Sequence, residues 1–143
     1  MMRAFFDTNV LVYLYDADAP EKQAHARELF ESEAMAGRAI ISTQVLQEFY
    51  VAVTRKLAVP LEPESAEEVV RNLAKLPVVS VDENRILSAI ARSRRLKLSF
   101  WDASIIETAL AGGAKRLFTE DLQHVLAISG LTVENPFLTS GGE

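Results

Sequence analysis

The 143-residue sequence contains no cysteine. That absence excludes disulfide frameworks, thiolate metal sites and cysteine nucleophiles, and it suits a reducing compartment. Positive charge is also scarce, because 15 Lys and Arg residues stand against 20 Asp and Glu residues and leave a formal net charge of −5. The chain as a whole therefore lacks the positive field of a non-specific nucleic-acid binder, although a local basic patch or bound metal ions can still reverse the sign at one site.

Several further patterns are missing. No apolar run approaches the ~20 residues of a membrane span, and the N-terminal apolar stretch is interrupted by Asp7 and lacks a signal-peptide cleavage pattern. We therefore expect a soluble cytoplasmic protein. No Walker A sequence, glycine-rich dinucleotide fingerprint, or serine or cysteine triad is present. The two histidines, His25 and His124, offer little for zinc; we expect His25 on the surface, whereas His124 is either a structural residue or one that faces a site formed around Asp121.

What is present is a regular alternation of apolar patterns, with 49% hydrophobic residues, enough for the core of one domain over residues 1–143. Strands are expected over residues 3–6, 38–42, 77–81, 115–119 and 131–135. Helices are expected from about residue 9 and over residues 20–36, 43–57, 64–75, 83–94, 100–110 and 120–129. This order predicts an α/β fold, a three-layer α/β/α sandwich with a mainly parallel central sheet, in which ligands bind at the carboxyl ends of the strands.

Four acidic residues interrupt or border apolar patterns near those expected strand ends and helix starts. Asp7 ends the first strand, and Asp121 follows the strand "RLFT" at the same level. Glu48 falls at the edge of the apolar arc of its helix, and Asp102 points toward the buried face of its own. Glu107, farther round that helix, is expected to face solvent.

Each of these carboxylates also has a purely structural interpretation. Ser99 and Asp102 have the spacing of a capping box, Asp7 and Asp121 can cap the helices that follow them, and Glu48 can lie on a solvated rim. Caps, however, do not require several carboxylates to converge, and their mutual repulsion penalises convergence unless cations are present. The four residues together therefore favour a shared cation site.

Carboxylate ligands without cysteine favour Mg²⁺ or Mn²⁺ over zinc, and such a site suits phosphodiester hydrolysis. Phosphates would then need a local cationic strip, for which one candidate follows the helix expected over residues 83–94 and another is Arg55 with Lys56. The first candidate strip consists of Arg92, Arg94, Arg95 and Lys97. A solvated helix end is the alternative interpretation of this run.

Four stretches, "FFDTNVLVYLYD", "STQVLQEFYVAV", "WDASIIETALAGGAKRLFTEDLQ" and "NPF", resemble the motifs of PIN-domain ribonucleases, in particular the VapC-type toxins of bacterial toxin–antitoxin pairs. The resemblance runs in order along nearly the whole chain, and only residues from about 60 to 95 carry little of it. It implies a Mg²⁺- or Mn²⁺-dependent endoribonuclease with a PIN-like fold, a homodimer, and a cognate antitoxin.

The resemblance also assigns residues. It implies an acidic centre of Asp7, Glu48, Asp102 and Asp121, with supporting polar groups at Thr8, Asn9 and Thr119. Glu120 leaves the fourth position open, and Asp121 is preferred because the acidic residue of the family stands directly before Leu-Gln. A glycine that often follows in the family is absent here.

Two other functions fit part of the same pattern. A PIN-like fold without catalysis would serve as an RNA- or protein-binding module. A phospho-receiver-like regulatory domain would use Asp7 and Asp82 at strand ends, but it also needs a lysine at the end of the strand that follows Thr119, and "LTVENPF" offers none.

Overall fold

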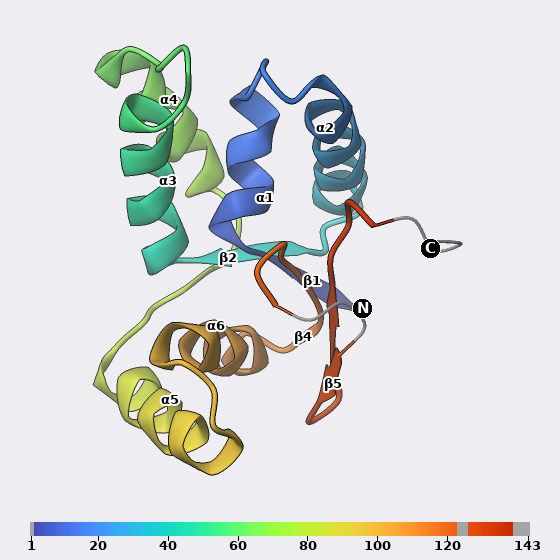
Figure 1. Ribbon diagram of the computed structural model, residues 1–143, viewed down its shortest axis with the longest axis vertical. Helices are drawn as coiled ribbons and strands as arrows, with labels where there is room; N and C mark the ends of the chain where they lie inside the picture. The colour runs from blue at the N-terminus through green and yellow to red at the C-terminus, as the bar shows by residue number, and fades with distance from the viewer. Residues whose placement is uncertain (1, 123–125, 139–143) are drawn as a thin grey trace.

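The computed structural model describes residues 2–122 and 126–138 of the chain. Its centre is a six-stranded sheet in the order β3-β2-β1-β4-β6-β5. All neighbouring strands run parallel except β5 and β6, which are antiparallel. Helices cover both faces of this sheet (Figure 1), so the predicted three-layer α/β/α sandwich is confirmed.

The first half of the chain forms one side of the sheet and the helices above it. β1 covers Arg3–Phe6 and is followed by the short helix α1, Thr8–Val12, which continues as the 3₁₀ helix η1, Tyr13–Tyr15. The remaining elements of this half are α2 (Pro20–Met35), β2 (Ala39–Ser42), α3 (Thr43–Arg55) and α4 (Pro63–Leu73).

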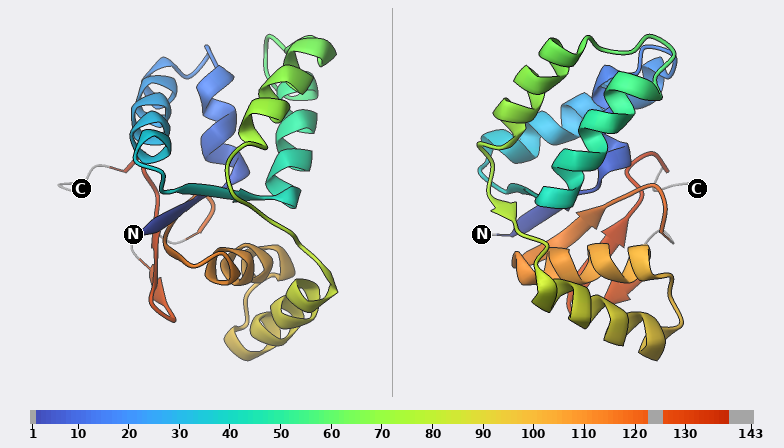
Figure 2. Two further views of the ribbon diagram at one scale, coloured as in Figure 1. Left: turned by 180° about the vertical axis from the view of Figure 1, so that it is seen from behind. Right: turned by 90° about the vertical axis from the view of Figure 1, so that its left-hand side faces the viewer.

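The second half supplies the opposite layer and the other edge of the sheet. Its elements are β3 (Val78–Val79), α5 (Glu83–Leu96), α6 (Phe100–Ala111), β4 (Ala114–Phe118), β5 (Leu126–Ile128) and β6 (Leu131–Glu134). The helices α1 to α4 lie on one face of the sheet and α5 and α6 on the other (Figure 2). No helix of the described residues is long and apolar enough to cross a membrane.

The core lies on both faces of the two central strands. Phe5 and Phe6 of β1 are fully buried between the helical layers, as a strand covered on both faces requires. Phe49 reaches the core from α3 and Ile106 reaches it from α6, on opposite sides of the sheet, and both are fully buried. Burial of such large side chains holds the two helical layers on the sheet.

The register of the central strands determines where the polar residues after them lie. Phe6 of β1 is paired with Phe118 of β4, and the Asp7 amide donates to the Phe118 carbonyl at 3.0 Å. The residues that follow the two strands, Asp7 and Thr119, are therefore neighbours at one edge of the sheet.

The helix predicted over residues 120–129 is wrong where the structure describes it. Residues 120–122 form bends, and Leu126–Ile128 form β5, which pairs with β6 in a hairpin. Ser129 and Gly130 connect the two strands with φ angles of 51° and 85°. Positive φ at both central residues is typical of a type I′ hairpin turn, and Ser-Gly is a turn signal that outweighs the weak helical spacing.

Helix α5 leaves much of its apolar surface exposed. Its apolar residues Ile86, Leu87 and Ile90 are 40, 63 and 42% exposed. One of the buried residues of α5 is Arg92, which forms an ion pair with Glu107 of α6. Glu107 therefore does not face solvent as predicted, and Arg92 is engaged inside the layer rather than available to a phosphate.

The pairing of Arg92 with Glu107 leads to a stability prediction. Both side chains are mostly buried, so Arg92→Met leaves the Glu107 charge without its partner and should lower the free energy of unfolding by about 2–4 kcal/mol. Arg92→Met combined with Glu107→Gln should recover most of that loss. Urea denaturation of both variants measures the difference, and equal losses in the two would contradict this role of the ion pair.

Candidate active site

A cavity of about 110 Å³ opens at the carboxyl edge of the sheet, between the two helical layers. Asp7 and Thr119 line it from the ends of β1 and β4, Glu48 lines it from α3, and Asp102 lines it from the first turn of α6. Asp121 completes the acidic lining. The structure thus brings the four acidic residues singled out in the sequence to one cavity.

Asp7 is the buried member of this group, with 9% of its surface exposed. Its Oδ1 accepts a hydrogen bond from the Thr8 amide at 2.7 Å, and its Oδ2 accepts one from the Thr119 hydroxyl at 2.7 Å. The first bond is an N-cap of α1, so the structural interpretation of Asp7 is correct. Capping and a place in the acidic cavity occur together because the two oxygens point to different partners.

Glu48 is held at the rim of the cavity by two side chains. Its Oε1 accepts from the Thr8 hydroxyl at 2.8 Å, and its Oε2 accepts from the Gln44 amide at 3.0 Å. Glu48 is exposed, whereas Phe49 beside it is fully buried in the core. The helix therefore anchors itself by its apolar face and presents Glu48 on its edge.

Asp102 and Asp121 reach the cavity by local hydrogen bonding. The Ser99 hydroxyl accepts from the Asp102 amide at 3.1 Å and caps α6, so the predicted cap is present and places Asp102 in the first turn. The Asp121 amide donates to the Thr119 hydroxyl at 3.1 Å. One hydroxyl thereby links Asp121 to Asp7.

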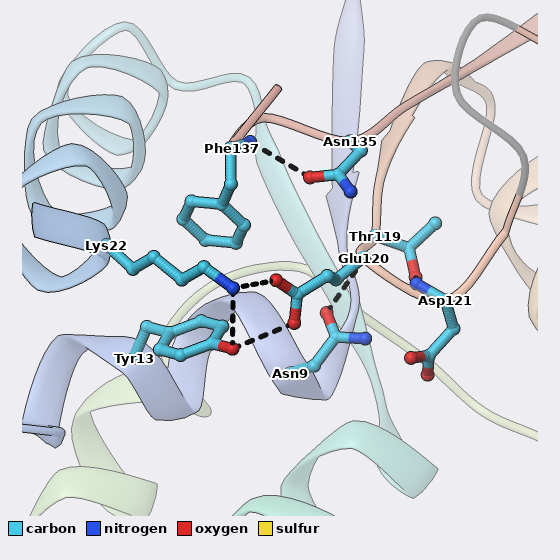
Figure 3. A network of polar contacts seen from close by, with 8 residues as sticks. All are labelled: Asn9, Tyr13, Lys22, Thr119, Glu120, Asp121, Asn135 and Phe137. Atoms are coloured by element: carbon cyan, nitrogen blue, oxygen red, sulfur yellow. Dashed lines mark hydrogen bonds and ion pairs between the residues drawn. The ribbon is translucent and has the colours of Figure 1, made fainter. Parts of the chain in front are cut away.

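Glu120 lies on the other side of this loop (Figure 3). Its carboxylate accepts hydrogen bonds from the Tyr13 hydroxyl and from Lys22, and it is not among the residues that line the cavity. Of the two neighbouring acidic residues, Asp121 lines the cavity and Glu120 does not. His124 lies outside the described residues, and His25 is exposed with its ring 6.0 Å from that of Phe137.

The four cavity carboxylates differ from several other acidic residues of the protein in their charge partners. Among the described residues, none of them forms an ion pair with a lysine, arginine or histidine. Burial raises the pKa of the Asp7 carboxyl to about 6, against the lowering effect of its bonds from Thr119 and Thr8, and the charges of Asp121 and Glu48 raise it further. The ionised form of Asp7 is therefore disfavoured, first by its desolvation and then by the neighbouring negative charges.

The donor set fits a hard divalent cation, because it offers carboxylate oxygens from four chain segments around one space. No group of three or more acidic or histidine side chains in residues 2–122 and 126–138 is closely enough arranged to enclose a metal ion. The site is thus an open acidic cavity rather than a closed cage.

The predicted supporting groups have distinct positions. Thr8 and Thr119 each bind a cavity carboxylate, as described above. Asn9 Oδ1 accepts from the Glu120 amide at 3.3 Å, while Asn9 Nδ2 is buried without a hydrogen-bond partner in the described part of the chain. A buried donor that stays unsatisfied is costly.

A larger groove of about 650 Å³ adjoins the cavity along α1 and α3. It shares Asp7, Glu48 and Asp121 with the cavity, and Asn9 and Lys56 also line it. Of the predicted cationic strip, Arg94, Arg95 and Lys97 are exposed near the end of α5. Asp82, by contrast, caps α5 by accepting from the Arg85 amide and does not line either space with Asp7, so the acidic pocket of a phospho-receiver is not formed.

Sequence analysis missed two residues of this region. Gln44 precedes Glu48 by four positions, a spacing that places both on one helix face and could have suggested their bond. Lys22 lies 98 positions from its partner Glu120, and no local pattern signals that contact.

The raised pKa of Asp7 predicts a stabilising substitution within the site. Because the folded protein binds the Asp7 proton more tightly than the unfolded chain does, this carboxyl makes the free energy of unfolding fall as the pH rises from about 4 to about 6. In EDTA at pH 7.5, Asp7→Asn should therefore raise the free energy of unfolding by about 1–3 kcal/mol, and at pH 4 by much less.

Urea denaturation followed by the fluorescence of Trp101, the single tryptophan, measures this effect. Asp18→Asn serves as the control, because Asp18 is exposed and this substitution removes the same charge at a position away from the cavity. An Asp7→Asn variant that is less stable than wild type at pH 7.5 would contradict the prediction.

Comparisons with solved structures and with protein-family models agree with this architecture. Comparison with curated protein sequences found no match. Among solved structures, a toxin–antitoxin complex from Klebsiella pneumoniae aligns with a TM-score of 0.69 at 22% identity, covering 94% of this chain and 98% of that one. A DNA-bound VapBC from Salmonella typhimurium aligns with a TM-score of 0.65 at 24% identity, covering 95% and 99%.

VapC20 from Mycobacterium tuberculosis, described as a toxin that cleaves the sarcin–ricin loop, aligns with a TM-score of 0.66 at 22% identity, covering 82% of this chain and 91% of that one. At these identities the structures show a shared fold. The model of the PIN domain family matches residues 4–126, which span every residue of the acidic cavity. The chain therefore belongs to the PIN domain family.

Proposed function

We propose that the protein is a metal-dependent endoribonuclease that hydrolyses RNA phosphodiester bonds, and that it acts as the toxin of a toxin–antitoxin pair. The observation that carries this proposal is the cavity in which Asp7, Glu48, Asp102 and Asp121 meet without a cationic partner among the described residues. Similarity to VapBC toxin–antitoxin proteins and to a toxin described as cleaving the sarcin–ricin loop supports it.

The four carboxylates are the proposed metal-binding and catalytic residues, with Mg²⁺ or Mn²⁺ as the cation. When bound, such an ion lowers the pKa of an attacking water and neutralises charge on the phosphate and the leaving oxygen. The protein side chains hold this arrangement in place. Thr8 and Gln44 orient Glu48. The Thr119 hydroxyl donates to Asp7 and accepts from the Asp121 amide, so it orients both residues.

Substrate contacts follow from the donors around the cavity. Asn9 Nδ2, buried and without a partner in the described residues, is a candidate donor to a phosphate oxygen. Arg94, Arg95 and Lys97 are candidate contacts to the RNA backbone, because they are exposed and precede the helix that carries Asp102. Arg92 is withdrawn from this set, since it is buried and paired with Glu107.

The proposal includes two protein partners and a location. A cognate antitoxin is proposed from the similarity to toxin–antitoxin complexes. A homodimer is proposed through α5, because Ile86, Leu87 and Ile90 form an exposed apolar face that one copy leaves uncovered. A cytoplasmic location follows from the RNA substrate.

Cleavage of RNA tests the central proposal. With Mg²⁺ or Mn²⁺ the purified protein should cut a structured RNA, and excess EDTA should abolish the cut. Asp102→Asn should lower the rate by roughly 100-fold or more, as expected for loss of a group that stabilises charge in the reaction. The exposed control Asp18→Asn should keep the wild-type rate, and an Asp102→Asn variant with full activity would overturn the assignment.

A measurement of metal binding, made beside the cleavage assay, separates a nuclease from a PIN-like module without catalysis. Quenching of Trp101 fluorescence by Mn²⁺ reports binding directly, because Trp101 lines the cavity beside Asp102. Quenching in wild type that Asp102→Asn weakens supports a working centre. RNA binding without quenching and without cleavage would instead show a binding module.

The α5 face predicts the behaviour of a charged variant. Leu87→Asp places a charge in the middle of the proposed dimer contact and should convert a dimer into a monomer in light scattering. Met35→Asp is the matched control, because Met35 is an 89% exposed apolar residue on α2, in the opposite layer. A Leu87→Asp variant with the mass of the wild-type dimer would exclude α5 as the interface.

A further inference from the structure

Two neighbouring carboxylates in the loop after β4 point in opposite directions. Asp121 faces the acidic cavity, whereas the Glu120 side chain extends toward α2 and η1 (Figure 3). The structure shows what holds Glu120 in that direction.

Two side chains bind the Glu120 carboxylate. The Tyr13 hydroxyl donates to Oε1 at 2.8 Å, and Lys22 Nζ donates to Oε2. Lys22 Nζ also donates to the Tyr13 hydroxyl at 3.2 Å, which closes a three-membered network. Both carboxylate oxygens are therefore occupied.

Aromatic rings fix the lysine in this network. Its Nζ lies 5.0 Å from the centroid of the Tyr13 ring and 5.5 Å from that of Phe137, within the range of cation–π attraction. The two rings pack edge to face at 4.9 Å. Segments from η1, α2, the loop after β4 and the chain after β6 thus meet at the Lys22 ammonium group.

The backbone of the loop is held from the opposite side. The Glu120 amide donates to Asn9 Oδ1 at 3.3 Å, the Asp121 amide donates to the Thr119 hydroxyl at 3.1 Å, and the Thr119 amide donates to the Glu134 carbonyl at 3.0 Å. These bonds and the contacts of the Glu120 side chain act on the same three residues, so the contacts of Glu120 with Lys22 and Tyr13 help to fix the loop from which Asp121 projects. Asp121 points into the cavity while Glu120 remains bound to Lys22.

We propose that Lys22 and Tyr13 are positioning residues for the acidic centre: by binding Glu120 they keep its carboxylate out of the cavity and hold Asp121 in it. This inference rests on the proposed nuclease function. Neither residue lines the 110 Å³ cavity, so neither is proposed to touch a cation there. Tyr13 lines the adjoining groove, whereas Lys22 lines neither space.

The contact has more effect on geometry than on stability. The Lys22 side chain is 42% exposed, and ion pairs at such positions contribute little to folding. A released Glu120 carboxylate, however, stands one residue from Asp121 and would compete with it for a cation or repel a phosphate. Displacement of a catalytic group by about 1 Å is enough to slow a reaction strongly.

Four variants test the inference: Lys22→Met, Tyr13→Phe, Lys22→Arg and the double variant Lys22→Met with Glu120→Gln. Lys22→Met should lower kcat for RNA cleavage by about 10-fold, weaken Mn²⁺ binding by a similar factor, and leave KM for RNA nearly unchanged, because the displaced group orients the centre and not the substrate. Lys22→Arg should restore both quantities. The double variant should lie closer to wild type than Lys22→Met does, because no carboxylate is released.

Tyr13→Phe keeps the ring contact with Phe137 and removes one bond to Glu120, so it should lower kcat by about 3-fold. It provides the decisive measurement if Lys22→Met does not fold at the assay temperature. Lys75→Met, at an exposed lysine in the turn after α4, should behave as wild type.

The outcomes separate this inference from the proposed function. If wild type cuts RNA and binds Mn²⁺ and both Lys22→Met and Tyr13→Phe keep its kcat and its Mn²⁺ affinity, the positioning role is overturned and the nuclease remains. An equal loss in Lys22→Met and in the double variant also overturns it, because the effect would not pass through Glu120. A wild-type protein without cleavage and without Mn²⁺ binding overturns the proposed function, and the inference with it.

Discussion

The Asp7 carboxylate accepts one hydrogen bond from the start of α1 and one from the residue that follows β4. Because β1 and β4 are parallel neighbours, the two bonds join the two central strand ends and begin a helix at the same point. The Thr119 hydroxyl then accepts from the Asp121 amide, and the Thr8 hydroxyl donates to Glu48. A short series of hydrogen bonds centred on Asp7 therefore orders three of the four cavity carboxylates, and the cap of α6 adds Asp102.

This arrangement is costly without a cation. Asp7 is buried and its pKa is raised to about 6, chiefly by desolvation, and two further carboxylates act on it in the same direction. A folded chain keeps such strain only where the surrounding packing determines the geometry, as the fully buried Phe6, Phe49 and Ile106 do on both sides of this site. The stability gained by a neutral residue at position 7 and the activity proposed for the charged one thus oppose each other.

Charges outside the cavity are paired where they could interfere with it. Glu120 is bound by Lys22 and Tyr13 on the far side of its loop, and Glu107 is bound by Arg92 between α5 and α6. Each pair keeps an acidic residue away from the site: Glu120 is next to Asp121 in the sequence, and Glu107 lies on the same helix as Asp102.

The choice of Asp121 over Glu120 rested on the resemblance to the PIN-domain family, but the sequence by itself determined most of the alternation of strands and helices, the possible caps by Asp7 and Ser99, and the other three cavity carboxylates as candidates. These features follow from apolar periodicity and from the residues at the ends of each element, which are local properties. Only the tertiary structure decided that Glu120 turns toward Lys22, that Arg92 pairs with Glu107 instead of facing solvent, and that residues 126–128 form a strand. The same limit explains α5, whose periodicity reveals an apolar face but not whether this chain covers it. Contacts between segments far apart in sequence depend on how packed layers bring them together, and no local pattern contains that information.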